Sequence, residues 1–404
     1  MAERADPTRF HLLKLKPREE KRLLAGHLWV YSNEVDTRKT PLKRFRPGQP
    51  VMIVSASSRV IGTGYVNPNS LICARLVTRS METALDGVLI HQRLAQALAL
   101  RQAIYSEPYY RLCFGESDGL PGLVLDRFGD WYSGQITTAG MQAHQQAVEQ
   151  ALDALLQPRS LVWRHDVAVR KLEDLPQENE VAFGAMPERV LVREAGLEFE
   201  TSLLDGQKTG WYYDQVANRH RMGKYVAGAD VADLYCYQGA WGLRAACAGA
   251  RSVVCVDSAQ RAIEGVEQAA RHNQLADRVQ ACRADVQQWL KQAVEEGRQY
   301  DVVILDPPAL IKRRRDQRDG QRAYQRLNEL ALRVLRPGGV LFSFSCSQHL
   351  SREDLRKLIN RAGMRLEMPL QLLETLQQGP DHPIHPAMPE TEYLKGFVVR
   401  RLLC

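Results

Sequence analysis

The chain of 404 residues is 45% hydrophobic and 25% charged, which is ordinary for a globular protein of two or three domains with sizeable cores. It has no apolar run of about 18 residues and its N-terminal stretch is charged throughout, so we expect no membrane span, no secretory signal and a cytoplasmic location. The net charge of +7 is concentrated in residues 1–79, which hold 15 Lys and Arg against 6 Asp and Glu, and the rest of the chain is nearly neutral.

The N-terminal part, residues 12–79, is predicted to be a small β-rich unit. Runs rich in Val, Ile and Tyr, separated by Pro, Gly, Asn and Ser, predict strands over 28–32, 50–56, 60–66 and 71–77. A short helix over 18–27 is expected to end at Gly26. The segment "RKTPLKRFR" (38–46) is a candidate exposed loop with five basic residues. The positive excess favours contact with a phosphate backbone, and the alternative is a solvated basic surface without a partner.

Residues 81–190 are predicted to form an α+β middle module. Helical periodicity covers 85–105 and 141–156, with strand and turn signals over 115–136 and 160–175. No residue of this stretch indicates a particular chemistry.

From about residue 191, strands alternate with helices. The expected strands cover 230–237, 252–257, 278–285, 300–308 and 340–347, and each is followed by a helical stretch. Ser351 and Asp354 resemble a capping box at the last helix. This alternation predicts a doubly wound, mostly parallel sheet, which binds ligands outside the carboxyl ends of its strands.

Three strand ends favour an adenosine-containing cofactor. Gly239 and Gly242 open the helix after the first strand, although the full G-x-G-x-x-G fingerprint is absent. Asp257 ends the second strand and could accept hydrogen bonds from ribose hydroxyls, or cap the next helix. Asp285 ends the third strand and could face an adenine amino group, or equally cap its own helix.

The fourth and fifth strand ends carry the residues with catalytic potential. "LDPP" (305–308) places Asp306 before two prolines that stiffen the turn, and the alternative is a simple strand-ending turn. Cys346, between two serines, should open onto the same edge, where a thiolate could act as a nucleophile. An inert buried thiol is the alternative, which is what we expect of most of the eight cysteines. No C-x-x-C pair occurs, so we expect no metal site.

Several motifs occur together in a recognisable order. They are "GESDGLPGLVLDRFG", "VRK", "GQKTGWYYDQVANR", "DLYCYQGAWG", "CVDSAQRAIE", "VILDPPAL", "PGGVLFSFSCS", "DHP" and "ETEYLKGFVVR". On these motifs the chain resembles the bacterial class I S-adenosylmethionine-dependent 23S rRNA cytosine-C5 methyltransferases of the RlmI type. The resemblance covers nearly the whole chain. It implies a PUA-like RNA-binding domain (1–80), a middle domain (81–190) and a class I methyltransferase domain (191–404).

The resemblance also implies a mechanism and a set of partners. Cys346 would attack C6 of a cytosine flipped out of its stack, and Asp306 would bind the N3/N4 edge of the base. The remaining family positions, Asp214, Gln215, Tyr237 and Gly239, would join Asp257 and Asp285 at the S-adenosylmethionine site. The implied partner is 23S rRNA or a large-subunit precursor. A homodimer is one option for the oligomeric state, and the base that removes the C5 proton is unassigned.

The chain departs from the family pattern beside the proposed site. Ala309 and Leu310 stand where the family usually has Lys and Phe, and "YQGAW" replaces the usual "YTGGF". As in the resembled family, no second cysteine accompanies "DPP". Three alternatives stand beside the interpretation that the resemblance implies. They are a different rRNA base methyltransferase acting on guanine, an RNA-binding protein with an inactive methyltransferase fold, and a nicotinamide-dependent oxidoreductase, which the broken glycine fingerprint disfavours.

Overall fold

A computed structural model describes residues 10–207 and 209–403 of the protein. The chain divides into two compact units. The N-terminal unit comprises the residues up to Val192 together with Thr201–Tyr213 and Pro380–Thr391. The C-terminal unit comprises Arg193–Glu200, Asp214–Gly379 and the chain from Glu392 onward. Each unit is described by itself.

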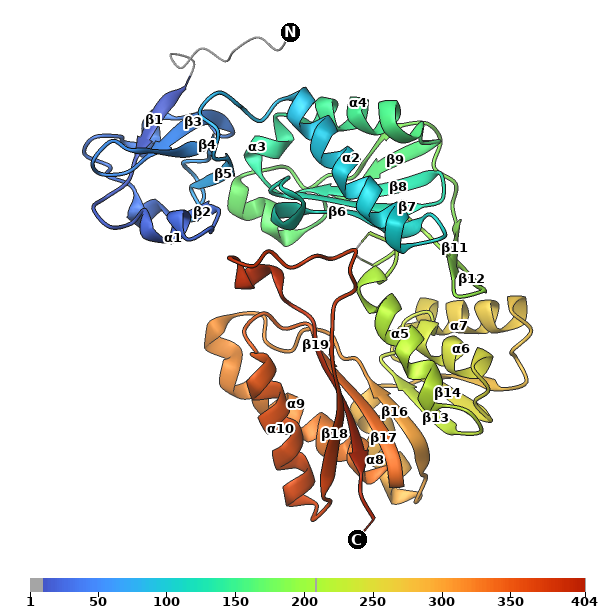
Figure 1. The fold of residues 1–404 in the computed structure, drawn as a ribbon. Coiled ribbons are helices and arrows are strands. Elements are labelled where there is room, and N and C mark those ends of the chain that lie inside the picture. The colour runs from blue at the N-terminus through green and yellow to red at the C-terminus, as the bar shows by residue number, and fades with distance from the viewer. Residues whose placement is uncertain (1–9, 208, 404) are drawn as a thin grey trace. The chain divides into compact units, whose positions relative to one another are not determined.

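The first part of the N-terminal unit is a five-stranded sheet with the order β1-β3-β4-β5-β2. Its elements are β1 (His11–Lys14), α1 (Lys21–Leu24), β2 (Trp29–Val30), β3 (Gln49–Val54), β4 (Val60–Val66) and β5 (Ala74–Thr78) (Figure 1). The four predicted strands are present, and β1, which pairs in parallel with β3, was not predicted. Leu13, Ile53 and Val66 belong to a buried apolar cluster on this sheet. The five basic side chains of segment 38–46 are exposed, as predicted.

The second part of the N-terminal unit is another five-stranded sheet, with the order β10-β9-β8-β7-β6. Its strands are β6 (Tyr109–Phe114), β7 (Leu123–Phe128), β8 (Trp131–Ile136), β9 (Ser160–Trp163) and β10 (Glu180–Phe183). Its helices are α2 (Gly87–Ile104), α3 (Ala139–Gln142) and α4 (Gln145–Leu156). Leu94 of α2 and Val148 of α4 are buried in one cluster with residues of this sheet, which explains the helical periodicity of both segments.

Buried polar contacts join these two parts. Glu173 is 1% exposed and accepts hydrogen bonds from Arg75 Nη1 at 2.9 Å and from Asn67 Nδ2 at 2.7 Å. The hydroxyl of Tyr65 donates to Pro121 O at 3.0 Å. Removing one member of such a buried ion pair leaves an uncompensated charge, which is strongly destabilising. The first sheet is therefore tied to the second rather than loosely tethered.

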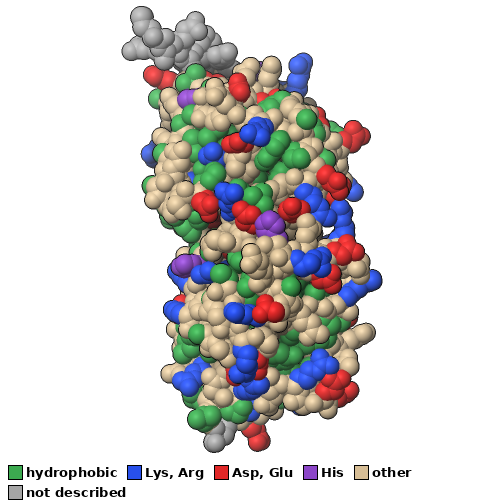
Figure 2. All heavy atoms as spheres, turned by 90° about the vertical axis from the view of Figure 1, so that its right-hand side faces the viewer, with side chains coloured by type: hydrophobic (Ala, Val, Ile, Leu, Met, Phe, Trp, Pro, Cys, Tyr) green, Lys and Arg blue, Asp and Glu red, His purple; other side chains and the backbone are tan. Residues whose placement is uncertain are grey.

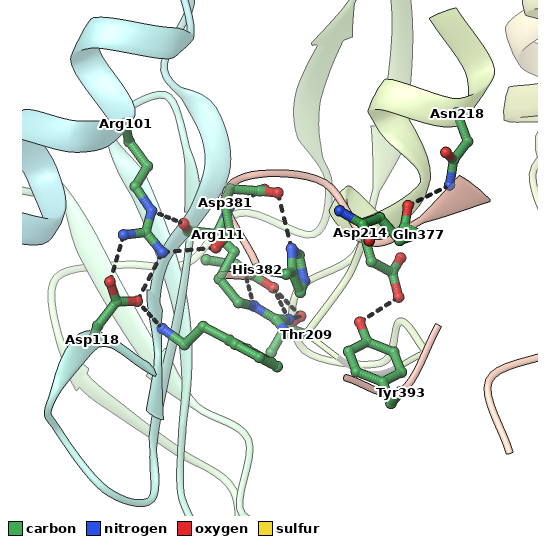
Figure 3. Close-up of polar contacts among 12 residues, drawn as sticks. Arg101, Arg111, Asp118, Thr209, Asp214, Asn218, Gln377, Asp381, His382 and Tyr393 are labelled. Carbon is green, nitrogen blue, oxygen red and sulfur yellow. Dashed lines mark hydrogen bonds and ion pairs between the residues drawn. The ribbon is translucent and has the colours of Figure 1, made fainter. Parts of the chain in front are cut away.

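Segment Pro380–Thr391 is anchored in the N-terminal unit by Asp381 (Figure 3). The carboxylate of Asp381 accepts from the backbone N–H of Arg111 at 3.0 Å and contacts His382 Nδ1 at 2.9 Å. Its carbonyl oxygen accepts from Arg101 Nη2 at 2.7 Å. Because Asp381 and His382 are 1% and 2% exposed, these bonds satisfy polar groups that water does not reach.

The C-terminal unit contains a seven-stranded sheet with the order β15-β14-β13-β16-β17-β19-β18. Its strands are β13 (Asp230–Leu234), β14 (Ser252–Asp257), β15 (Val279–Arg283), β16 (Tyr300–Leu305), β17 (Leu335–Ser345), β18 (Leu370–Gln377) and β19 (Lys395–Arg401). The first five in the order are parallel, as predicted, and β19 and β18 add an antiparallel edge that was not predicted. A two-stranded pair, β11 (Val190–Glu194) and β12 (Leu197–Thr201), precedes the sheet in the chain.

Helices cover both faces of this sheet. They are α5 (Val216–Met222), α6 (Ala240–Cys247), α7 (Gln260–His272), α8 (Val286–Glu295), α9 (Gln317–Arg333) and α10 (Arg352–Arg365). The buried cluster that contains residues of α8, α9 and α10 includes Ala232 and Val254 of the sheet. Gly242 of α6 lies against Val253 and Cys255, whose side chains point to the opposite face. The predicted doubly wound α/β fold is thus confirmed.

Two surface features complete the description. No helix within the two described stretches of chain is long and apolar enough to cross a membrane. On the face drawn in Figure 2, Lys and Arg side chains are interspersed with Asp and Glu rather than gathered into one large field.

Candidate active site

The carboxyl ends of five parallel strands meet at one edge of the C-terminal sheet. β13 has β14 on one side and β16 on the other, although two strands, β14 and β15, separate β13 from β16 in the chain. The strand order therefore reverses beside β13, which is where open α/β sheets bind ligands. Asp257, Asp306 and Cys346 stand at the ends of β14, β16 and β17.

The turn after β13 is tightly wound. Tyr235, Tyr237 and Gly239 have φ angles of 64°, 50° and 75°, in the left-handed region that only glycine adopts without strain. Non-glycine residues keep such angles where the surrounding structure enforces them, often at ligand sites. A Cβ on Gly239 would lie 2.9 Å from Leu243 Cδ1, so a side chain here would displace Leu243 in addition to straining the backbone.

Asp257 supports this turn. Its carboxylate accepts from Tyr237 N at 3.0 Å and from Ala259 N at 2.9 Å. Both oxygens thus bond backbone N–H groups, and because each oxygen has two lone pairs, the half-buried carboxylate can still accept from a ribose hydroxyl.

Asp285 caps its own helix. Its Oδ1 accepts from Gln288 N at 3.0 Å at the start of α8, which is one of the two roles that its position indicated. The side chain is exposed, so a ligand at the strand ends could still reach the carboxylate.

Asp306 receives two hydrogen bonds from neighbouring segments. Gln215 Nε2 donates to Asp306 Oδ2 at 2.9 Å, and Trp241 Nε1 donates to the same oxygen at 3.3 Å. Gln215 is in turn fixed by Asn218 Nδ2, which donates to its Oε1 at 2.7 Å. These bonds bring Gln215, the start of α6 and the end of the fourth predicted strand together around one half-buried carboxylate.

Asp214, the residue before Gln215, is buried and accepts from the hydroxyl of Tyr393 at 2.6 Å (Figure 3). Its carbonyl oxygen accepts from Gly379 N at 3.0 Å. Asp214 therefore anchors the segment, and its role toward a cofactor stays a prediction. Lys208 of the same motif lies outside the described residues.

Cys346 is half-buried, whereas Ser345 and Ser347 on either side of it are 0% exposed. The hydroxyl of Tyr324 bonds both serines, at 2.8 Å to Ser345 Oγ and 2.9 Å to Ser347 Oγ. Ser347 Oγ also accepts from Ile311 N at 3.1 Å, in the loop that follows Asp306. This buried hydroxyl network fixes the backbone on both sides of the cysteine and ties the fourth strand's loop to the fifth strand's end.

Four residues of this region were not among the predicted site residues. Tyr324 lies in a helical stretch, and nothing in its pattern marks it. Trp241 stands where the resembled family usually has Phe, and its indole N–H gives it a bond to Asp306 that Phe cannot make. Lys395 lies in the "EYLKGF" motif. Asp233 is 0% exposed, and burial raises the pKa of its carboxyl to about 7.

The arrangement suits an adenosine-containing group that brings a reactive centre to the strand ends. The strained turn, the accessible carboxylates of Asp257 and Asp285, and Asp306 all lie at the carboxyl edge of the sheet. Tyr237 is half-buried within that turn and Gly239 is buried, so a side chain and a closely approachable backbone stand next to Asp257. These residues fit such a cofactor.

Comparisons with known proteins show which families this chain is similar to. A PUA-like domain model matches residues 13–79, and a model described as conserved hypothetical protein 95 matches residues 216–319. The "Ribosomal RNA large subunit methyltransferase I" of Aeromonas hydrophila is 36% identical over 388 residues, which cover 94% of this chain and 97% of the relative.

Solved structures share the fold over nearly the full length. A structure from Streptococcus mutans, assigned as an S-adenosylmethionine-dependent methyltransferase, aligns with a TM-score of 0.82 at 20% identity, over 96% of this chain and 99% of that one. A structure of SMU.776 complexed with S-adenosylhomocysteine aligns with a TM-score of 0.83 over the same shares, also at 20% identity. At this identity the likeness shows a common fold.

Proposed function

Because this chain belongs to the ribosomal RNA large subunit methyltransferase I family, whose fold and S-adenosylmethionine cofactor it shares, we propose that it methylates C5 of a cytosine in 23S rRNA through an adduct with Cys346. The observation that carries this proposal is the setting of Cys346. Cys346 is half-buried between two buried serines, at the end of the strand next to the one that ends before Asp306.

Each residue has a role in the proposed reaction. The Cys346 thiolate adds to C6 of the base, so the S–C6 bond forms and an electron pair moves to C5. Asp306, already oriented by Gln215 and Trp241, accepts a hydrogen bond from the N4 amino group. The cofactor supplies the methyl group, which C5 takes as the bond to the sulfonium sulfur breaks. A general base then takes the C5 proton, and the electron pair of the broken C–H bond restores the C5–C6 double bond as the S–C6 bond breaks and the thiolate leaves.

Two exposed basic segments support an RNA substrate. One is segment 38–46, and the other is 312–315, which directly follows Ile311 in the loop bonded to Ser347. The second segment is therefore close in the chain to the base-binding carboxylate and suits the phosphates that flank the target nucleotide. The family membership also supports the proposed division into domains over 1–80, 81–190 and 191–404.

The proposal is tested with the full-length protein, labelled S-adenosylmethionine and 23S rRNA from a strain that lacks the protein. Cys346→Ala should abolish methyl transfer while binding of S-adenosylhomocysteine survives. Cys247→Ala is the matched control, since Cys247 is an exposed thiol on α6, and it should retain activity. Undiminished transfer by Cys346→Ala would overturn the covalent mechanism.

A second measurement tests the assignment of the atom. Nucleosides from the methylated RNA are identified by mass spectrometry, and 5-methylcytidine is expected. RNA with 5-fluorocytosine at the mapped site should form a stable complex with the wild type but not with Cys346→Ala, because fluorine at C5 blocks the final proton removal. A methylated guanine instead would refute the C5 assignment.

A further inference from the structure

Lys395, the first residue of β19, is buried directly beside the end of β17. It pairs in register with Ser345, the last residue of β17, and is 4% exposed. Its Nζ donates to the carbonyl oxygen of Ser347 at 2.7 Å. The ammonium group therefore reaches past Ser345 and lies at the backbone of the residue after Cys346.

An ammonium group has three donors, and this one has a single hydrogen-bonded acceptor among the described residues, the carbonyl oxygen of Ser347. No carboxylate of the described chain forms an ion pair with Lys395. The nearby Glu392 is instead paired with Arg352 Nη2 at 2.7 Å. Burying a cation without a paired anion costs free energy, so we expect a negatively charged group close to the Lys395 ammonium.

The charged and titratable groups around Lys395 come from three segments. Burial lowers the pKa of Lys395 to about 8, with Arg352 acting in the same direction, whereas Cys346 and Glu392 act to raise it. The hydroxyl of Tyr324, on α9, is hydrogen-bonded to the serines on either side of Cys346, and burial raises its pKa. A neutral tyrosine hydroxyl adds no charge, and Glu392 is held by Arg352, so the thiol of Cys346 is the remaining group that can carry the compensating negative charge.

We propose that Lys395 is a positioning residue that holds Cys346 as a thiolate through the charge of its buried ammonium group and through its bond to the Ser347 carbonyl oxygen. This inference rests on the proposed function, because it assigns Lys395 to the nucleophile of that reaction. The inference explains why a cysteine at this strand end would react near neutral pH, because a cation next to a thiol favours the thiolate.

The test measures the thiol directly and requires neither RNA nor S-adenosylmethionine. The full-length protein is treated with iodoacetamide between pH 5 and pH 10, and alkylation of the Cys346 peptide is followed by mass spectrometry. Lys395→Met should move the pH midpoint of alkylation up by about one unit or more and slow alkylation at pH 7 roughly tenfold. Lys395→Arg keeps the charge and should leave the midpoint near that of the wild type. Cys247 reports in the same samples and should not change.

Lys395→Gln separates charge from hydrogen bonding, because its amide can still donate to Ser347 O but carries no charge. Its midpoint should move like that of Lys395→Met, and it serves in place of Lys395→Met if that variant does not fold. An unchanged midpoint in the uncharged variants would overturn the proposal, as would equal shifts in Lys395→Gln and Lys395→Arg, which would indicate packing alone. Loss of methyl transfer by Cys346→Ala is measured separately, so a failure here leaves the proposed function standing.

Discussion

Asp233 is the most deeply buried acid at the candidate site, and replacing it with Asn should alter how stability depends on pH. The residue lies on β13, is 0% exposed, and its Oδ2 accepts from Gly242 N at 2.9 Å. Its Oδ1 has no hydrogen-bond partner within the described chain. Burial is the main reason why the pKa of the carboxyl rises to about 7, and the charges of Asp306 and Asp257 act in the same direction.

The size of the effect follows from the two pKa values. The folded protein holds a proton on Asp233 up to about pH 7, whereas the unfolded chain releases it near the ordinary value of 3.8. Because the folded state binds more protons in this window, stability falls as the pH rises through it. At about 1.4 kcal/mol per pH unit, the wild type should lose roughly 2–3 kcal/mol relative to Asp233→Asn between pH 5 and pH 8.

The measurement is urea unfolding of both proteins at several pH values, with the difference in free energy plotted against pH. The fixed cost of burying the new amide, which does not titrate, adds the same offset to this difference at every pH, so the change of the difference with pH reports the titration of Asp233. Asp230→Asn is the matched control on the same strand. Bonds from Arg251, Ser252 and Arg336 lower the pKa of Asp230, so its stabilisation is constant above about pH 5 and this variant should be less stable by a constant amount. A constant difference for Asp233→Asn as well would refute the reasoning.

Two further predictions concern the reaction and the RNA. Trp241→Phe restores the aromatic residue usual in the family but removes the 3.3 Å hydrogen bond to Asp306. The rate of methyl transfer should therefore fall by roughly threefold to tenfold, with cofactor binding unchanged. An unaltered rate would show that Gln215 suffices to orient the Asp306 carboxylate. Changing the five cations of 38–46 to Gln should reduce the slope of log affinity for RNA against log salt by about 0.7 for each phosphate that is no longer neutralised. The four cations of 312–315 are changed to Gln for comparison. A smaller salt slope only in that variant would indicate that 312–315 is the main phosphate-binding site.

The five charge changes are preferable to deletion of residues 1–79 for a structural reason. Deletion would remove Arg75 and Asn67 and leave the buried Glu173 carboxylate without its paired cation. Weakened RNA binding after deletion could then reflect damage to the second sheet. Surface substitutions keep these buried bonds and report on charge alone.

The local signals in the sequence were sufficient for most elements whose structure depends on neighbours in the chain. The parallel strands and their helices follow from alternating apolar periods and turn residues, and Ser351 caps α10 as its position predicts, accepting from Asp354 N at 3.0 Å. Strands β1, β6, β18 and β19 were missed. β1 and β19 pair with strands that are distant in the sequence, whereas β6 forms a hairpin with β7, and β18 pairs with β19. β19, for example, pairs with β17 from about 50 residues further along the chain.

By itself, then, the sequence determined the α/β class, the order of the motifs, and the placement of Asp306 and Cys346 at the ends of neighbouring strands. Their catalytic roles stay predictions. Only the tertiary structure decided what surrounds them. Burial makes Asp233 hold its proton, strand register brings Lys395 beside Ser345, and packing of α9 puts Tyr324 against the serines. Desolvation and contacts between distant segments set these properties, and neither is encoded in any local pattern of residues.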